Sequence, residues 1–126
     1  MLILLFLSSG LFLGWSLGAN DASNIFGTAV STRMVKFYTA AIVASIFVVL
    51  GAIVSGAGTT HTLGKLGAVD MIAGAFMVAL AAAVTVFWMT KLSLPVSTSQ
   101  AIVGAIVGWN MFAGKTTDMH ALTKIA

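Results

Sequence analysis

The chain has 126 residues, of which 60% are hydrophobic and only 7% are charged, and its net charge is +3. Soluble domains average about a quarter charged residues, so a soluble fold of this size would lack the polar surface needed to cover its core. The composition excludes an ordinary soluble domain and predicts an integral membrane protein. Six basic residues are too few for a nucleic-acid-binding patch, and the lack of cysteine excludes disulfides and thiolate metal sites.

The first apolar block runs from Met1 to about Val30 and is interrupted by the polar stretch GANDASN, residues 18–24. A single helix of this length would be about 42 Å long, more than the ~30 Å hydrocarbon core of a bilayer. We therefore expect the first helix to be broken at GANDASN, either ending there or crossing as a discontinuous helix. The block lacks the basic region of a signal peptide, so we expect it to be retained rather than cleaved.

Three further apolar blocks follow. Phe37–Val54 and Met71–Met89 each match the ~20 residues that a membrane-spanning helix requires. Asp70 directly precedes the second of these and is predicted to be its N-cap. Ala101–Ala113 is too short to cross alone and favours a re-entrant half-helix. The expected fold is an all-α integral membrane bundle with a broken first helix and a re-entrant helical hairpin, forming one membrane domain over residues 1–126.

The basic residues between the blocks indicate the topology. Three crossings place the connection with Arg33 and Lys36 on one side of the membrane and Lys65 on the other. The positive-inside rule then predicts that the N-terminus is outside. We expect a multi-pass protein of the plasma membrane. If the short fourth block returns to the side that it entered, five basic residues are expected in the cytoplasm: Arg33, Lys36, Lys91, Lys115 and Lys124.

Small residues recur at every fourth position in three of the blocks. Ridges of this kind let helix backbones approach closely in membranes, so they predict packing within a bundle of several helices. They do not indicate what the bundle does. The three ridges are Gly10, Gly14 and Gly18; Ala75, Ala79 and Ala83; and Gly104 and Gly108.

A second polar stretch, LPVSTSQ at residues 94–100, has the layout of a helix N-terminus. Pro95, the only proline of the chain, comes first, and small polar side chains follow before an apolar segment. Ser97 and Gln100 have the spacing of a capping box. The unpaired N–H groups and the positive dipole end of such a terminus can bind an anion in low-dielectric surroundings. We predict an oxyanion site at Ser97, Thr98, Ser99 and Gln100.

GANDASN has the same layout, with Gly18 as the helix-breaking residue and with Asn20 and Asp21 as strong N-cap candidates. An ionisable residue within a membrane segment is a functional-site hypothesis by default. Because a carboxylate repels an anion unless it is protonated or a cation lies between them, and because amide oxygens suit Na⁺, we predict a cation site at Asn20, Asp21 and Asn24. The alternative is that both stretches are interfacial loops that cap ordinary helices.

These two stretches also carry a family resemblance. GANDASNIFGTAV and LPVSTSQAIVGAIVG resemble the two signature segments of the inorganic phosphate transporter (PiT) family, and they occur in the same order. The resemblance implies symport of inorganic phosphate with Na⁺ or H⁺, no other cofactor, and inverted repeats that place the site between two halves. It also implies that five residues contribute to this site: Asn20, Asp21, Ser97, Thr98 and Ser99.

The chain departs from the family pattern in two ways. Many relatives have Thr-His after the serine and threonine of PVST, where this chain has Ser99 and Gln100, so a proton role for a histidine there is unsupported. Family members are also much longer and carry a second GAND-type segment. We therefore expect this chain to be the N-terminal half of a transporter, completed by a second half or by a homodimer partner.

The sequence contains no nucleophile–base pair and no glycine-rich phosphate loop with a lysine, so we do not expect an enzyme. Because the basic residues are so few, we do not expect a nucleic-acid partner either. The leading hypothesis is cation-coupled phosphate symport across the lipid bilayer. Sulfate or another oxyanion is a competing substrate, because neutral donors cannot fully separate two tetrahedral anions. The alternatives from other classes are a channel and a non-transporting small membrane subunit.

Overall fold

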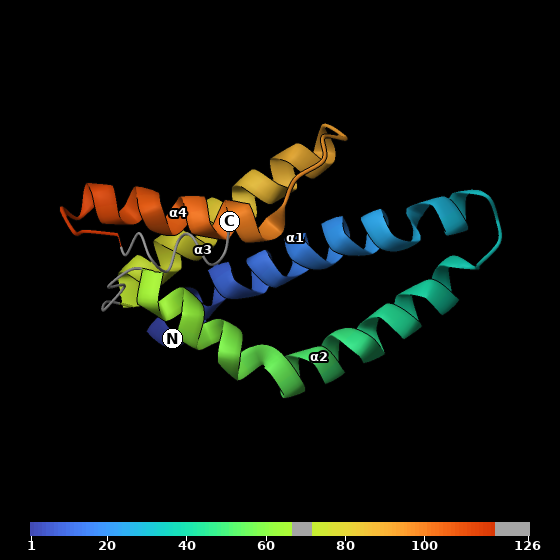
Figure 1. The fold of residues 1–126 in the computed structure, drawn as a ribbon, viewed down its shortest axis with the longest axis horizontal. Helices are drawn as coiled ribbons and strands as arrows, with labels where there is room; N and C mark the ends of the chain where they lie inside the picture. The colour runs from blue at the N-terminus through green and yellow to red at the C-terminus, as the bar shows by residue number, and fades with distance from the viewer. Residues whose placement is uncertain (67–71, 118–126) are drawn as a thin grey trace.

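The computed structural model describes residues 1–66 and 72–117, and within these ranges helices and short turns make up the chain (Figure 1). Three helices in the described part are long and apolar enough to cross a membrane, over Ile3–Ser31, Phe37–Gly56 and Ile72–Lys91. The predicted all-α membrane class is therefore confirmed, and the three candidate spans coincide with the three blocks predicted to cross. The full helices are α1 (Leu2–Ser31), α2 (Phe37–Leu66), α3 (Ile72–Lys91) and α4 (Thr98–Phe112).

Helix α1 is continuous through GANDASN, so the predicted break in the first helix is wrong. Gly18 lowers helix propensity by about 1 kcal/mol relative to alanine but does not stop a helix. Asn20 and Asp21 lie inside α1 rather than at an N-cap, which corrects the second prediction for this stretch. The Ser23 hydroxyl donates to the Asn20 carbonyl oxygen at 2.8 Å, a local bond that the interior of a helix accommodates.

The other helix boundaries differ less from expectation. Helix α2 continues past the predicted end at Val54 to Leu66, because the glycine-rich sequence after Val54 contains no proline to stop a helix. Helix α3 extends to Lys91. Helix α4 begins at Thr98, before the predicted start at Ala101. Asp70 and Lys124 lie outside the described residues, and so do the predictions made for them.

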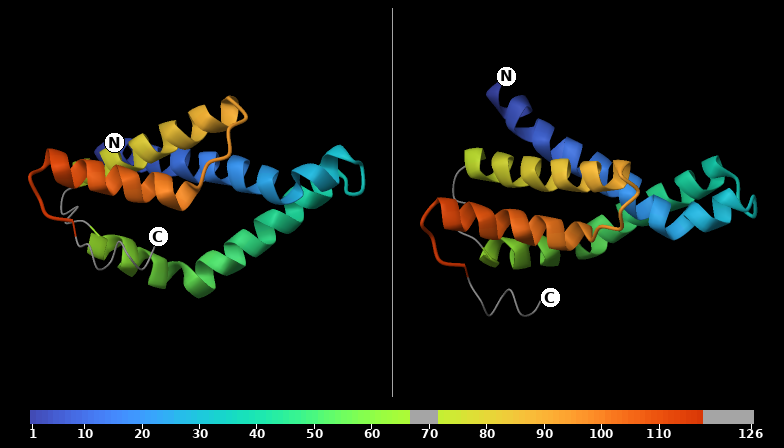
Figure 2. Two further views of the ribbon diagram at one scale, coloured as in Figure 1. Left: turned by 45° about the horizontal axis from the view of Figure 1, so that its top comes forward. Right: turned by 90° about the horizontal axis from the view of Figure 1, so that it is seen from above.

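Helices α1 and α3 run side by side in the same direction, while α2 and α4 run back (Figures 1 and 2). Ring contacts fix this alignment. Phe6 near the start of α1 packs on Phe76 near the start of α3, with ring centroids 5.9 Å apart. Further along, Trp15 packs on Phe87 at 5.8 Å. The core lies where α1 and α4 both pack on α3, and Val86 on α3 is completely buried there.

Helix α2 runs away from the end of α1, bends near its middle and returns at its far end toward α4, so it packs on this core only at its two ends (Figure 1). Ala40 near its start is buried, but most of its large apolar side chains are exposed. In a bilayer, lipid tails contact such a surface without the penalty that water would impose. The bundle that positions the polar residues described below is therefore made by α1, α3 and α4.

The connection between α3 and α4 is a tight turn that lies partway along α1, which continues beyond it (Figure 2). Helix α3 ends in a Schellman motif: the Leu94 N–H donates to the Met89 carbonyl oxygen at 2.9 Å, and the Ser93 N–H donates to that of Thr90 at 3.1 Å. Ser93 has φ 56, the left-handed conformation that this motif requires. The turn fits the predicted helical hairpin, and its re-entry into the membrane stays a prediction.

Gly74 marks a close approach of α3 to α4. A Cβ atom added there would lie 2.8 Å from the indole ring of Trp109, closer than packed carbon atoms approach. Of the predicted ridges, only Ala83 is fully buried. The ridges on α1 and α4 are exposed and would have open space around an added Cβ among the described residues, at Gly10, Gly14, Gly18, Gly104 and Gly108.

We expect Gly74→Ala to lower the melting temperature of the protein in detergent, because the added methyl group forces the Trp109 ring to shift. Overpacking of this kind costs about 1–3 kcal/mol of folding free energy. The matched control is Gly104→Ala on α4, where the methyl group meets open space and alanine favours the helix by up to about 1 kcal/mol. Thermal unfolding followed by circular dichroism compares the two. Equal melting temperatures would contradict the described α3–α4 packing.

Candidate functional site

Asn20 lies at the polar centre of the bundle, although it belongs to a predominantly apolar helix. Its side chain is only 3% exposed. The Oδ1 atom accepts a hydrogen bond from the Thr90 hydroxyl at 3.2 Å. The Nδ2 atom donates to Asp21 Oδ1 at 3.1 Å and to the Val96 carbonyl oxygen at 3.2 Å. One carboxamide therefore joins α1, the end of α3 and the link that leads into α4.

The two polar stretches, which are distant in sequence, meet at this carboxamide. Asp21 belongs to GANDASN and Val96 to LPVSTSQ, and both acceptors lie within hydrogen-bond distance of the same nitrogen atom. Ser97 directly follows Val96. The structure thus brings a carboxylate from one stretch close to the start of the helix that the other stretch begins.

Helix α4 has the N-terminus that the sequence predicts. Ser97 is its N-cap, with an extended backbone at φ −86 and ψ 116, and its Oγ accepts a hydrogen bond from the Gln100 N–H at 3.4 Å. Pro95 lies in the link, where its ring and missing N–H prevent α3 from continuing. Asn20, Asp21, Thr90 and the Val96 carbonyl group form what we call the Asn20 cluster. The first-turn N–H groups of α4, and the positive end of its dipole, therefore lie beside this cluster.

The remaining predicted site residues lie at the outside of the described chain. Such a polar surface is costly at membrane depth unless water, ions or other protein groups cover it. The side chains of this polar face are Asp21, Asn24, Ser97, Ser99 and Gln100, which are exposed, and Thr98, which is half-buried. The sequence did not predict the inward direction of Asn20, and the site role of these exposed residues stays a prediction.

Thr90 is the cluster residue that the sequence did not reveal. It lies at the end of an apolar block, outside both polar stretches, and its hydroxyl also donates to the Val86 carbonyl oxygen at 2.7 Å. The only indication in the sequence is that Thr90 is a small polar residue just before Lys91. Its partner Asn20 is 70 residues away, a distance that no local pattern reports.

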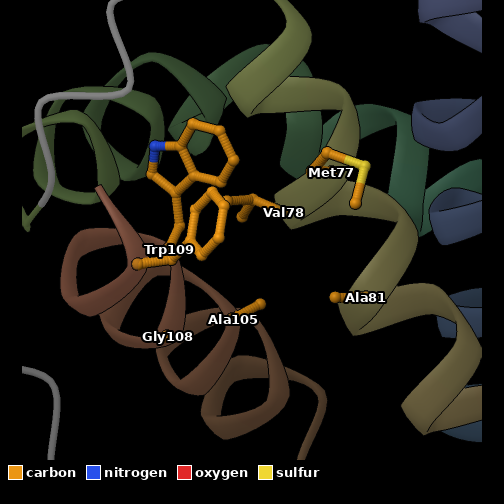
Figure 3. Close-up of a pocket in the computed structure, with 7 residues that line it drawn as sticks. Met77, Val78, Ala81, Ala105, Gly108 and Trp109 are labelled. Carbon is orange, nitrogen blue, oxygen red and sulfur yellow. The ribbon is translucent and has the colours of Figure 1, made fainter.

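A groove between α3 and α4 provides a different kind of surface (Figure 3). Figure 3 shows the Trp109 side chain reaching from α4 toward α3 along this groove. Its volume is about 310 Å³. An oxyanion needs hydrogen-bond donors or cations around it, so this groove does not suit phosphate. None of its lining residues is charged: Met77, Val78, Ala81, Ala105, Gly108, Trp109 and Phe112.

Fold and site together define a multi-pass α-helical membrane protein with a buried polar centre where a helix N-terminus lies close to a carboxylate. Residues 17–126 match the phosphate transporter family, and the matched range contains both polar stretches. The chain belongs to this family. The family is one of transporters rather than of enzymes.

Relatives from distant organisms support this membership. Three of them are named as inferred phosphate permeases. The chain is 35% identical to one from Chlamydia pneumoniae over 128 residues, covering 94% of this chain and 30% of that protein. It is 35% identical to one from Pyrococcus abyssi over 122 residues, covering 89% and 30%. The match to one from Mycobacterium bovis has 35% identity over 109 residues, covering 79% and 20%. The chain thus spans 30% or less of the length of these relatives, and no solved structure matches it.

Proposed function

We propose that this chain contributes one half of the substrate site of a symporter that moves inorganic phosphate across the plasma membrane together with Na⁺ or H⁺. Membership of the phosphate transporter family supports phosphate as the substrate. The observation that carries the mechanism is the Asn20 carboxamide, whose nitrogen donates both to the Asp21 carboxylate and to the backbone just before α4.

Phosphate binds at the N-terminus of α4 in this proposal. The first-turn N–H groups and the positive dipole end attract an oxyanion. The hydroxyls of Ser97, Thr98 and Ser99 and the Gln100 carboxamide add neutral donors. Ser97 can donate its own proton to phosphate while its oxygen accepts from the Gln100 N–H, because a hydroxyl both donates and accepts. Neutral donors bind the anion without holding it as tightly as a cationic side chain would, which suits a site that must release its substrate.

The coupling cation binds at Asp21, with the carboxamide oxygen of Asn24 as a further ligand. Asn20 was also predicted to be a ligand, but its Oδ1 accepts from Thr90 and its Nδ2 faces Asp21, so in this proposal Asn20 orients the carboxylate instead. Near neutral pH, phosphate is a mono- or dianion, and an ionised Asp21 would repel it in a low-dielectric site. A bound Na⁺ or a proton on the carboxylate removes this repulsion. Phosphate and the cation then strengthen each other's binding by the same factor, because such coupling is reciprocal.

The exposed polar face supports a site that is completed from outside this chain. In the proposal, a second transporter half or a second copy of the chain covers Asp21 and the α4 N-terminus, as in transporters that bind substrate between inverted repeats. The N-terminus of the chain faces the outside of the cell, following the distribution of the basic residues.

The test is uptake of labelled phosphate into proteoliposomes that contain the protein expressed from its complete reading frame. We expect uptake that an inward Na⁺ or proton gradient drives and that unlabelled phosphate inhibits, with empty liposomes as the control. Inhibition by sulfate as strong as that by phosphate would identify a broader oxyanion permease. Uptake whose rate depends on neither gradient would contradict symport. An absence of uptake by the folded protein would favour a non-transporting subunit.

A further inference from the structure

We propose that Thr90 is a positioning residue of this site: it holds the Asn20 carboxamide in the one orientation that joins Asp21 to the link before α4. This inference rests on the proposed function for its effect on transport, but the geometry behind it comes from the cluster itself. Thr90 would touch neither phosphate nor the cation. It would act through Asn20.

The orientation of the Asn20 carboxamide is restricted by what surrounds it. Asp21 Oδ1 and the Val96 carbonyl oxygen are both acceptors, and both bond to Asn20 Nδ2. Rotating the amide by a half-turn would place Oδ1 against these two oxygens and lose both bonds. In the observed orientation, Oδ1 faces α3 instead, where it needs a donor because the side chain is buried.

Thr90 supplies that donor. Its Oγ lies 3.2 Å from Asn20 Oδ1 and 2.7 Å from the Val86 carbonyl oxygen, so its single proton is shared between a contact across the helices and one within α3. Thr90 is half-buried, but the residue that it bonds to, Asn20, is only 3% exposed, so few other donors can reach the carboxamide oxygen. Without this donor, Asn20 either keeps an unsatisfied buried oxygen or turns outward and releases Asp21 and Val96.

Thr90 also begins the turn that this arrangement stabilises. Its carbonyl oxygen accepts from the Ser93 N–H in the Schellman motif that ends α3. One residue therefore fixes the end of α3 through its backbone and the register of α1 through its side chain. Together, these two contacts determine where the link ends and α4 begins.

The test compares Thr90→Val, which removes only the hydroxyl, with Thr90→Ser, which restores it. Thr85→Val is the matched control, because Thr85 lies on the same helix and bonds to the Ala81 carbonyl oxygen at 2.8 Å, but it is exposed. For transport, we expect Thr90→Val to raise the KM for phosphate and the half-saturating cation concentration by roughly tenfold, as loss of one buried hydrogen bond predicts. Thr90→Ser and Thr85→Val should stay within about twofold of wild type on the same scale.

A second measurement separates this inference from the proposed function. Hydrogen exchange of the backbone amides in residues 92–97, followed by mass spectrometry, reports on the turn whether or not the protein transports phosphate. We expect faster exchange in Thr90→Val and wild-type exchange in Thr90→Ser and Thr85→Val. If wild type takes up no phosphate but this pattern appears, the proposed function fails and the positioning role holds.

Two results would overturn the positioning role. One is wild-type exchange of residues 92–97 in Thr90→Val. The other is a lowered melting temperature in Thr90→Val with unchanged KM and cation dependence in a protein that does transport, which would leave Thr90 with only a structural role.

Discussion

Asn20→Ala is expected to abolish phosphate uptake and to lower the melting temperature in detergent. The change removes three hydrogen bonds: one to Asp21 within α1, one to the end of α3 and one to the link before α4. It also leaves the half-buried Val96 carbonyl oxygen without this donor. A buried polar group that loses its partner costs about 1–3 kcal/mol, so both folding and the position of α4 should suffer.

Asn20→Asp tests the same cluster more sharply. The side chain keeps its shape, but it loses the Nδ2 donor and places a second carboxylate beside Asp21. Like charges this close in low dielectric repel strongly, so we expect a larger loss of stability than for Asn20→Ala. Asn24→Ala, at an exposed position one turn further along α1, is the control for stability and should melt as wild type does. Wild-type melting and uptake in both Asn20 variants would contradict the cluster.

The second large effect is expected for Asp21→Asn, which should keep the fold and lose cation-dependent uptake. The carboxamide preserves the shape of the side chain and an oxygen that can accept from Asn20 Nδ2, and it removes only the charge. Asp21 is exposed on α1, so no buried packing is disturbed. An uncompensated carboxylate at bilayer depth costs on the order of 2.5–3.5 kcal/mol on insertion scales, so its removal should not harm insertion.

The measurement is phosphate uptake against Na⁺ concentration and against pH, for wild type and Asp21→Asn in the protein expressed from its complete reading frame. The wild-type rate should rise with one of the two cations, and the Asp21→Asn rate should be low and independent of both. The melting temperature of each sample is the control for folding. Curves that superimpose would show that the charge of Asp21 has no part in coupling.

The membrane class and the spanning segments were predictable because composition and block length are local properties of the sequence. The start of α4 was predictable for the same reason: Pro95 stops one helix, and the Ser97–Gln100 spacing begins another within a few residues. Each of these features follows from neighbours in the chain, so no knowledge of tertiary contacts was needed.

The course of α1 was not predictable in this way. Glycine, asparagine and aspartate together favour a helix end by local rules, and those rules failed because Asn20 finds its partners on α3 and in the link 76 residues away. One local signal was available. Ser9, Ser16 and Asn20 are all buried on α1 and share a helical face, so a continuous helix with a polar seam was an alternative interpretation.

The separation between Asn20 and its partners also bears on how the chain is made. Thr90 is synthesised 70 residues after Asn20. At roughly 5–20 residues per second, several seconds pass in which the Thr90 hydroxyl on α3 and the Val96 carbonyl oxygen in the link do not yet exist. Lipid offers such a group no hydrogen bonds. The hydrogen bonds of Asn20 to Thr90 and Val96 can therefore form only after α3 and the link have been made, so the packing of α1 is completed late, by segments that leave the ribosome after it.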